Sequence, residues 1–118
     1  VKSGRSIGLI ADQNAGKRGV IAPLMGIPTS TFRGPVYLSY LTGLPLIPVF
    51  AFRSGPGNLR IEIWEPIRFK WRGNGRLTPE DLAECAAEYN RALEKAIRKH
   101  PEQWLWLHRR WRNEEGGR

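Results

Sequence analysis

The first two-thirds of the chain consists of short apolar runs separated by glycine, proline and charged residues. Continuous apolar runs of this length are typical of strands that are buried on both faces. We therefore expect three buried strands, and these fall at residues 7–11, 20–22 and 46–52. The longest apolar run is far shorter than the roughly 20 residues that a membrane-spanning helix requires.

A further run predicts a strand toward the edge of a sheet. Residues 59–63 alternate apolar and polar side chains, so Leu59, Ile61 and Ile63 are expected to face the core while the residues between them face water. The turn-forming residues 54–58 separate this strand from the run before it. That spacing predicts a β-hairpin.

Two segments carry helix signals. The hydroxyl residues 29–31 are candidate N-caps for a helix over residues 32–42, and Gly43 stands where such a helix would end. The stronger signal begins at Thr78, which is followed by proline at the first helical position and two acids in the first turn. Basic residues occupy the last turn, at residues 98–99. The apolar residues that recur at helical spacing are Leu82, Ala86, Tyr89, Leu93 and Ile97.

Length and composition limit the chain to one domain. It has 118 residues, 41% of them hydrophobic, which is enough apolar material for a folded core. The mixture of strand and helix signals predicts an α/β fold, as part of a mixed sheet with covering helices. We expect this domain to occupy residues 1–112, with a flexible tail at residues 113–118.

The charge and cysteine content narrow the function classes. The chain has 19 Lys and Arg against 11 Asp and Glu, a formal net charge of +8, which favours anionic partners. The single cysteine, Cys85, excludes an internal disulfide framework and a zinc site built on cysteines. Its place beside Ala86 on the predicted long helix favours a small buried thiol over a nucleophile.

Neither histidine belongs to a recognisable catalytic set. His100 ends the predicted long helix, where a partly charged imidazole is typical of a C-terminal cap. His108 is expected to pack or hydrogen-bond within the C-terminal segment. Because no acid or cysteine lies at ligand spacing from either, we expect no metal ion, and we expect no cofactor. The phosphate-loop pattern also fails, since Arg18 follows Lys17 where serine or threonine is needed.

Two segments remain as candidates for binding. The loop at residues 12–19 follows a predicted strand, and its glycines could turn backbone N–H groups toward an anion while Lys17 and Arg18 add charge. A solvated turn would explain the same residues. The aromatic and cationic residues 104–112 fit a core-packing tail with snorkelling cations, a contact with an anionic membrane surface, or a nucleic-acid patch.

Three segments also match a known family in residues and in order. They are ADQNAGKRGV at residues 11–20, TGLPLIPVF at residues 42–50 and HPEQWLWLHRRW at residues 100–111. Together they resemble the C-terminal portion of the bacterial lipid A biosynthesis acyltransferases, the lauroyl/myristoyl acyltransferase family. The resemblance covers almost the whole chain, and the last segment is its most specific part.

The resemblance implies one part of a membrane-associated, glycerolipid-acyltransferase-like enzyme. Such an enzyme moves a fatty acyl chain from acyl carrier protein to a hydroxyl of a lipid A precursor, at the cytoplasmic face of the bacterial inner membrane. The implied partners are therefore acyl carrier protein, the lipid A precursor and the anionic inner-membrane surface, and no nucleic acid is expected.

The family's general base lies in a His-x-x-x-x-Asp/Glu motif, which deprotonates the acceptor hydroxyl. Leu105 stands five residues after His100, and Asn113 five after His108, so this chain lacks the motif. We expect the motif and an N-terminal membrane helix to lie before Val1. The 118 residues alone are then expected to be inactive, and to self-associate through the sheet face that the missing half would cover.

The resemblance also assigns site residues. Asp12 matches the acidic residue of the family's Asp-x-x-x-Gly block and is expected to support the active site. Arg109 and Arg110 match a terminal arginine pair that either binds phosphate or sits structurally under the active site. The residues expected to contact substrate are Gln13, Gly16, Lys17, Arg18, Gly19, Arg109 and Arg110.

A competing interpretation needs no catalysis. The net charge, the cations of the 12–19 loop and the aromatic tail are also compatible with a small basic module that binds nucleic acid or an anionic membrane surface. A lipid-binding remnant without activity is a third possibility. Salt-dependent binding of nucleic acid without affinity for anionic vesicles would favour the nucleic-acid module.

Overall fold

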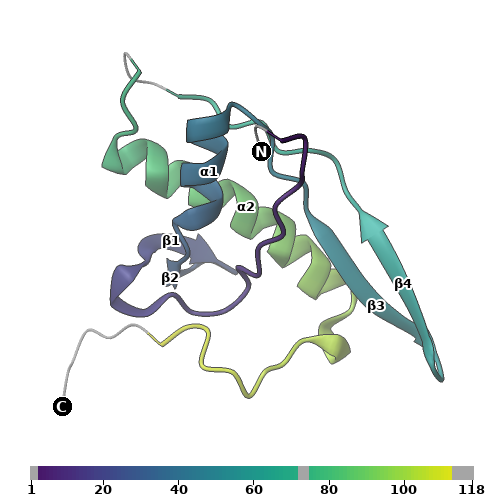
Figure 1. Ribbon diagram of the computed structural model, residues 1–118. Coiled ribbons are helices and arrows are strands. Elements are labelled where there is room, and N and C mark those ends of the chain that lie inside the picture. Colours follow the sequence, from purple (N-terminus) through teal and green to yellow (C-terminus); the bar gives the residue numbers. More distant parts are fainter. Residues whose placement is uncertain (1–2, 72–74, 113–118) are drawn as a thin grey trace.

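The computed structural model describes residues 3–71 and 75–112, so the expected tail at residues 113–118 lies outside the described residues. Two antiparallel hairpins pack with two helices (Figure 1). The elements are η1 (Gly16–Arg18), β1 (Val20–Leu24), β2 (Ile27–Thr31), α1 (Gly34–Thr42), β3 (Val49–Gly55), β4 (Asn58–Ile63), α2 (Pro79–Lys99) and η2 (Pro101–Gln103). The predicted α/β class is confirmed, and its strands are arranged as two separate two-stranded sheets.

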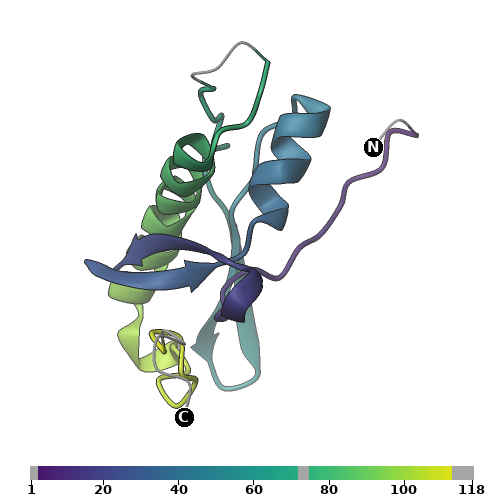
Figure 2. The ribbon, with the colours of Figure 1, turned by 90° about the vertical axis from the view of Figure 1, so that its left-hand side faces the viewer.

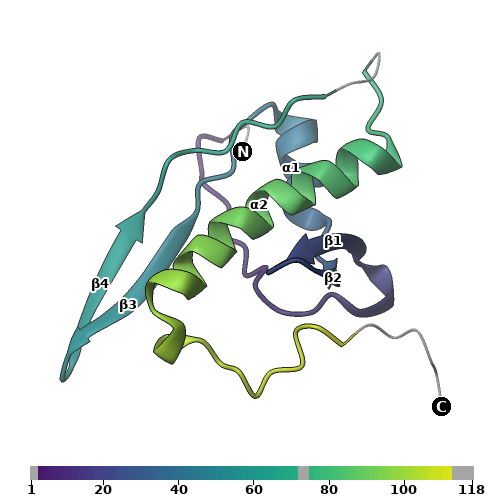
Figure 3. The same ribbon diagram turned by 180° about the vertical axis from the view of Figure 1, so that it is seen from behind.

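Helix α2 forms where its local signals predict. The Thr78 hydroxyl accepts a hydrogen bond from the Asp81 N–H (3.1 Å), and the Asp81 carboxylate accepts one from the Thr78 N–H (3.2 Å), which makes a complete capping box. The five predicted apolar positions are all buried. Figure 3 shows α2 running across one face of the molecule, next to both hairpins. It therefore supplies one wall of the core on which the rest of the chain packs.

Residues 29–31 are not helix caps, and the prediction for them is wrong. They lie buried in β2, which pairs with β1 through a two-residue turn at Met25 and Gly26. Both turn residues have positive φ (54° and 75°), as the tight hairpin turns that match strand twist require. Asn90 of α2 fixes this hairpin by donating to the Pro23 carbonyl (3.1 Å) and to the Thr31 hydroxyl (3.0 Å).

Helix α1 is consequently shorter than the predicted one. It begins at Gly34, after an Arg33 N-cap that makes no side-chain capping bond. Its predicted end is confirmed, because Gly43 adopts the left-handed conformation (φ 68°) and its N–H donates to the Ser39 carbonyl (2.8 Å). Figure 2 shows α1 beside the upper part of α2, with the first hairpin below α1 and in front of the lower part of α2.

The predicted strand at residues 7–11 does not form. This segment is extended but has no strand partner among the described residues, and Ile7, Leu9 and Ile10 are exposed. An isolated extended segment gains no ladder of hydrogen bonds, so apolar content alone does not make a strand. The predicted strand over 46–52 starts later, at Val49, while Leu46 makes a single bridge with Ile67.

The second hairpin is present as predicted, but its faces are reversed. Leu59, Ile61 and Ile63 are 68%, 59% and 72% exposed, whereas they were expected to face the core. The opposite face carries Phe52, which is buried, and Glu62, which is partly covered by α2. Alternation determines which residues share a face, and the helix packed against the hairpin determines which face is covered.

Candidate functional site

The loop at residues 12–19 is held in place by Arg110. Its guanidinium is fully buried. Nε donates to the Asp12 carbonyl (2.8 Å), and Nη1 donates to the Ser30 carbonyl (2.8 Å) and to the Thr29 hydroxyl (3.1 Å). Burial lowers the pKa of the Arg110 guanidinium. The electrostatic effects of Tyr89 and Asp12 oppose this decrease. Of the two interpretations of the arginine pair, this geometry fits a structural role for Arg110.

Arg109 differs from its neighbour because its side chain is exposed. The structure therefore separates two residues that look equivalent in the sequence. Arg109 remains accessible for a phosphate contact. Arg110 donates three hydrogen bonds to protein acceptors, and its buried Nη2 has no hydrogen-bond partner among the described residues.

Asn14 organises the loop, and our sequence analysis did not select it. Its Nδ2 donates to the carbonyls of Arg110 (2.8 Å) and Arg112 (2.9 Å), and its Oδ1 accepts from the Gly16 N–H (2.8 Å). Its backbone N–H donates to Nε2 of His108 (3.2 Å). The His108 ring thus bonds to the loop, while its backbone bonds within the C-terminal segment, as predicted, to the Leu105 carbonyl (3.1 Å) and the Arg110 N–H (2.8 Å). An asparagine two residues before a glycine is a recognisable turn signal, but its long-range partners are not visible in a sequence.

The structure explains why both positions of the loop are occupied by glycine. Gly16 has a φ of +61°, which favours glycine. A Cβ on Gly19 would lie 2.0 Å from the Ser30 hydroxyl oxygen, so no side chain fits there. The N–H groups of both glycines are already used, by the Asn14 side chain and by the Gly16 carbonyl. The glycines therefore shape the loop, and their own amides do not form the predicted anion cradle.

The remaining predicted site residues lie on the exposed side of the loop. Asp12 and Gln13 are exposed, and so are Lys17 and Arg18 on η1. Asp12 is one of the residues that line an apolar pocket, and its backbone is held by the bond from Arg110 to its carbonyl. The loop consequently presents one carboxylate and two cations at its surface, on a backbone that Arg110 holds.

The pocket has a volume of about 420 Å³ and lies between residues 9–12, residues 46–52 and one side of α2. Its walls are mostly aliphatic and aromatic. The lining residues with polar side chains include Asp12, Tyr89, His100 and Gln103. Several of its lining residues are exposed, so the pocket is open to solvent. This size and lining are typical of a site for a small apolar ligand.

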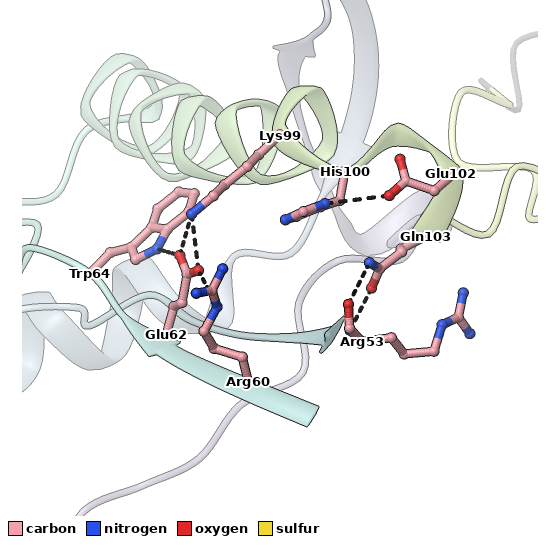
Figure 4. Close-up of polar contacts among 8 residues, drawn as sticks. All are labelled: Arg53, Arg60, Glu62, Trp64, Lys99, His100, Glu102 and Gln103. Atoms are coloured by element: carbon pink, nitrogen blue, oxygen red, sulfur yellow. Dashed lines mark hydrogen bonds and ion pairs between the residues drawn. The ribbon is translucent and has the colours of Figure 1, made fainter. Parts of the chain in front are cut away.

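Polar contacts around the end of α2 hold one wall of the pocket (Figure 4). The Gln103 side chain pairs with the backbone of Arg53, accepting from its N–H (2.7 Å) and donating to its carbonyl (3.1 Å), much as a neighbouring strand would. His100 is the C-cap of α2, as predicted, and its ring packs on Phe52 with centroids 4.7 Å apart. Its Nδ1 lies 3.3 Å from the Glu102 carboxylate.

A salt bridge fixes the second hairpin to the same end of α2. Lys99 donates to both carboxylate oxygens of Glu62 (2.8 and 2.9 Å), and the Trp64 indole N–H also donates to Glu62 (3.0 Å). These bonds, with Lys99 first, lower the pKa of Glu62. Figure 4 shows the lysine above the carboxylate, between helix and strand.

Cys85 is buried in the core on α2, as predicted. Burial, followed by the charges of Glu88, Asp81 and Glu84, raises its pKa to about 11. A thiol in this state is a poor nucleophile at neutral pH. In the described part of the chain, no helix is both long enough and apolar enough to cross a membrane.

Comparison with known protein families places this sequence in one of them. Residues 1–113 match the family model described as bacterial lipid A biosynthesis acyltransferase. The chain belongs to this family. The resemblance carried by the three segments is thereby confirmed, and the acyltransferase assignment of the family with it.

Curated relatives in two organisms support the match. The chain is 29% identical over 120 residues to the lipid A biosynthesis palmitoleoyltransferase of Escherichia coli K12 and to a lipid A biosynthesis acyltransferase of Shigella flexneri. It is 30% identical over 120 residues to the lipid A biosynthesis lauroyltransferase of Escherichia coli K12. Each alignment covers 99% of this chain and 37% of the relative. The chain thus spans little more than a third of the length of these relatives.

Proposed function

We propose that this chain forms one part of an enzyme that transfers a fatty acyl chain from acyl carrier protein to a hydroxyl of a lipid A precursor. The match over residues 1–113 carries the proposal. The names of the relatives support lipid A as the class of acceptor. The proposed location is the cytoplasmic face of the bacterial inner membrane.

The chemistry requires a base and an open electrophile. The acceptor hydroxyl attacks the thioester carbonyl carbon while a base takes the hydroxyl proton. The C–S bond then breaks, an ester forms, and the carrier's sulfur leaves as a thiolate that receives this proton from the base. The base is proposed to belong to the His-x-x-x-x-Asp/Glu motif, which these 118 residues do not contain. Residues outside this chain therefore supply the proton transfer.

This chain contributes the pocket and the loop beside it. An apolar pocket of about 420 Å³ suits the hydrocarbon of a fatty acyl group, since burial of each methylene contributes about 0.8 kcal/mol. Asp12 lines that pocket, and its backbone carbonyl accepts a hydrogen bond from Arg110. We assign Asp12 a supporting role, in which its charge orients catalytic or substrate groups. We assign the contacts with the acceptor's phosphates to the exposed cations Lys17, Arg18 and Arg109.

The test is an acyl-transfer assay with the protein encoded by the complete reading frame that contains this chain. Labelled acyl carrier protein is the donor and a lipid A precursor is the acceptor. We expect Asp12→Asn to lower kcat by about 100-fold or more, in the range of a lost electrostatic contact in an active site. Glu65→Gln is the matched control, because Glu65 is exposed and does not line the pocket.

Two results would count against the proposal. Absence of transfer by the unaltered protein, with both substrates present, would remove the assigned function. Full activity of Asp12→Asn would remove only the role of Asp12. Transfer by the 118 residues alone would contradict the assignment of the base to residues outside them.

A further inference from the structure

The C-terminal segment carries an exposed apolar apex, which we define as residues 105–107. Leu105, Trp106 and Leu107 are 66%, 53% and 91% exposed. They belong to an irregular segment that runs along the lower margin of the molecule in Figure 1, below β1 and β2. Consecutive large apolar side chains in water are unfavourable, and such a patch on a folded chain marks an interaction surface.

The apex has a defined shape. The Trp106 indole N–H donates to the Pro101 carbonyl (2.8 Å), and the ring stacks on Trp111 with centroids 6.0 Å apart and planes inclined by 12°. Trp111 in turn donates to the Leu24 carbonyl of β1 (3.0 Å). The apex is therefore bonded to its own segment and stacks on Trp111, which is bonded to the first hairpin, so the apex has a defined conformation.

Cations flank the apex. Arg109 and Arg112 are exposed and lie within five residues of Leu107 along the chain. Arg18 is exposed on η1, and the bonds from Asn14 to residues 110 and 112 hold its loop against the same segment. Among the described residues of these two segments, 12–19 and 100–112, the exposed acids are Asp12 and Glu102, so the positive charges predominate there.

Aliphatic and indole side chains beside arginines match the interface of an anionic bilayer. Tryptophan resides at the headgroup level, leucine inserts into the acyl boundary, and arginine contacts lipid phosphate. Nucleic acid would use the arginines and Trp106 but would leave two exposed leucines without a partner. We propose that the 105–107 apex inserts into an anionic lipid surface while Arg109 and Arg112 contact its phosphates.

Insertion of the apex would also bring the pocket close to the lipid surface. Gln103 and Trp104 line it and directly precede the apex in the chain. The inference rests on the proposed function only in that it names the surface through which that site meets its lipid substrate. Binding to vesicles requires no turnover, so its failure is distinguishable from a failure of acyl transfer.

The experiment measures binding of the 118-residue chain to vesicles of phosphatidylcholine with or without phosphatidylglycerol. In a Cys85→Ala background, an environment-sensitive dye is attached at Leu107→Cys, with Leu41→Cys and Ile61→Cys as controls. Leu41 and Ile61 are exposed apolar residues on α1 and β4, away from the apex. We expect a blue shift at position 107 alone, and only with anionic lipid.

Two variants separate the components of binding. Arg109→Gln with Arg112→Gln should weaken binding by about 30-fold, since each cation near an anionic surface contributes about 1 kcal/mol. Leu105→Ser with Leu107→Ser should weaken it by at least about tenfold, because the inserted hydrocarbon is lost. Circular dichroism of each variant establishes that the fold is kept.

Three outcomes would overturn the proposal. A blue shift at position 61 with none at 107 would assign binding to the exposed face of the second hairpin. Unchanged binding of Leu105→Ser with Leu107→Ser would exclude insertion. Absence of vesicle binding, with salt-dependent binding of nucleic acid, would assign the patch to that partner instead.

Discussion

Replacement of Arg110 tests whether this side chain is the structural anchor of the 12–19 loop. Arg110→Met keeps much of the volume and removes the charge and all donors. Two buried groups then lose one hydrogen bond each. The Ser30 carbonyl still accepts from the Ala15 N–H (3.3 Å), and the Thr29 hydroxyl still donates to the carbonyl of residue 110 (2.6 Å). The Asp12 carbonyl belongs to an exposed residue that water can reach. Each lost hydrogen bond to a charged group contributes about 1.5–3 kcal/mol.

The net loss is smaller than the sum of the lost bonds, because the variant no longer buries a guanidinium. Relief of that desolvation offsets part of the loss. We expect Arg110→Met to lower the free energy of unfolding by about 3 kcal/mol, a large share of the roughly 5–15 kcal/mol of a domain. The exposed Arg109 is the matched control, and Arg109→Met should change it by less than about 0.5 kcal/mol.

Arg110→Lys gives the sharper discrimination. Lysine retains the charge, but its single ammonium cannot reach the three acceptors that the planar guanidinium bridges, and it is more strongly hydrated. We therefore expect Arg110→Lys to be at least as destabilising as Arg110→Met. If charge alone were the contribution of Arg110, lysine would instead be the milder substitution.

Urea unfolding followed by circular dichroism measures these differences, at two protein concentrations so that self-association is detected. Hydrogen exchange at the amides of Asn14, Ala15 and Gly16 provides a local readout, since these N–H groups are bonded within the anchored loop and its contacts. Arg110→Lys close to the unaltered chain in stability, or unchanged exchange in Arg110→Met, would refute the anchoring role.

Three further outcomes follow from the geometry. Gly19→Ala should lower the melting temperature measurably, because a Cβ at residue 19 meets the Ser30 hydroxyl. Gly8→Ala is the control and should not lower it, because residue 8 has open space. Equal melting curves would contradict this expectation. Glu62→Gln should make the free energy of unfolding fall less steeply as the pH is lowered. The depressed pKa of Glu62 contributes stability at pH values above its ordinary value of 4.5, and this stability is lost as the pH falls through the folded value. A fall as steep as that of the unaltered chain would show that other groups control the acid dependence. Ile61→Ser with Ile63→Ser should reduce self-association in analytical ultracentrifugation, because these side chains form part of an exposed apolar face; an unaltered chain that is already monomeric would refute the expectation.

The sequence by itself determined the features that local free energies control. The capping box, proline and charged ends of α2 act within one helical turn, so its bounds and buried positions were predictable. The hairpin turn near residues 54–58 and the left-handed end of α1 at Gly43 are equally local. The family match could be predicted from three short segments, because they concern residue identity rather than packing.

The tertiary structure decided every feature that depends on a distant partner. Residues 29–31 became a strand because β1 and Asn90 satisfy them, and residues 7–11 did not because the described chain offers them no neighbouring strand. The exposed side of β4 was set by α2. Arg109 and Arg110 differ in burial because only Arg110 contacts the buried acceptors of β2. Hydrogen bonds and burial between segments far apart in the chain have no signature in local residue order, and these interactions shape the candidate site.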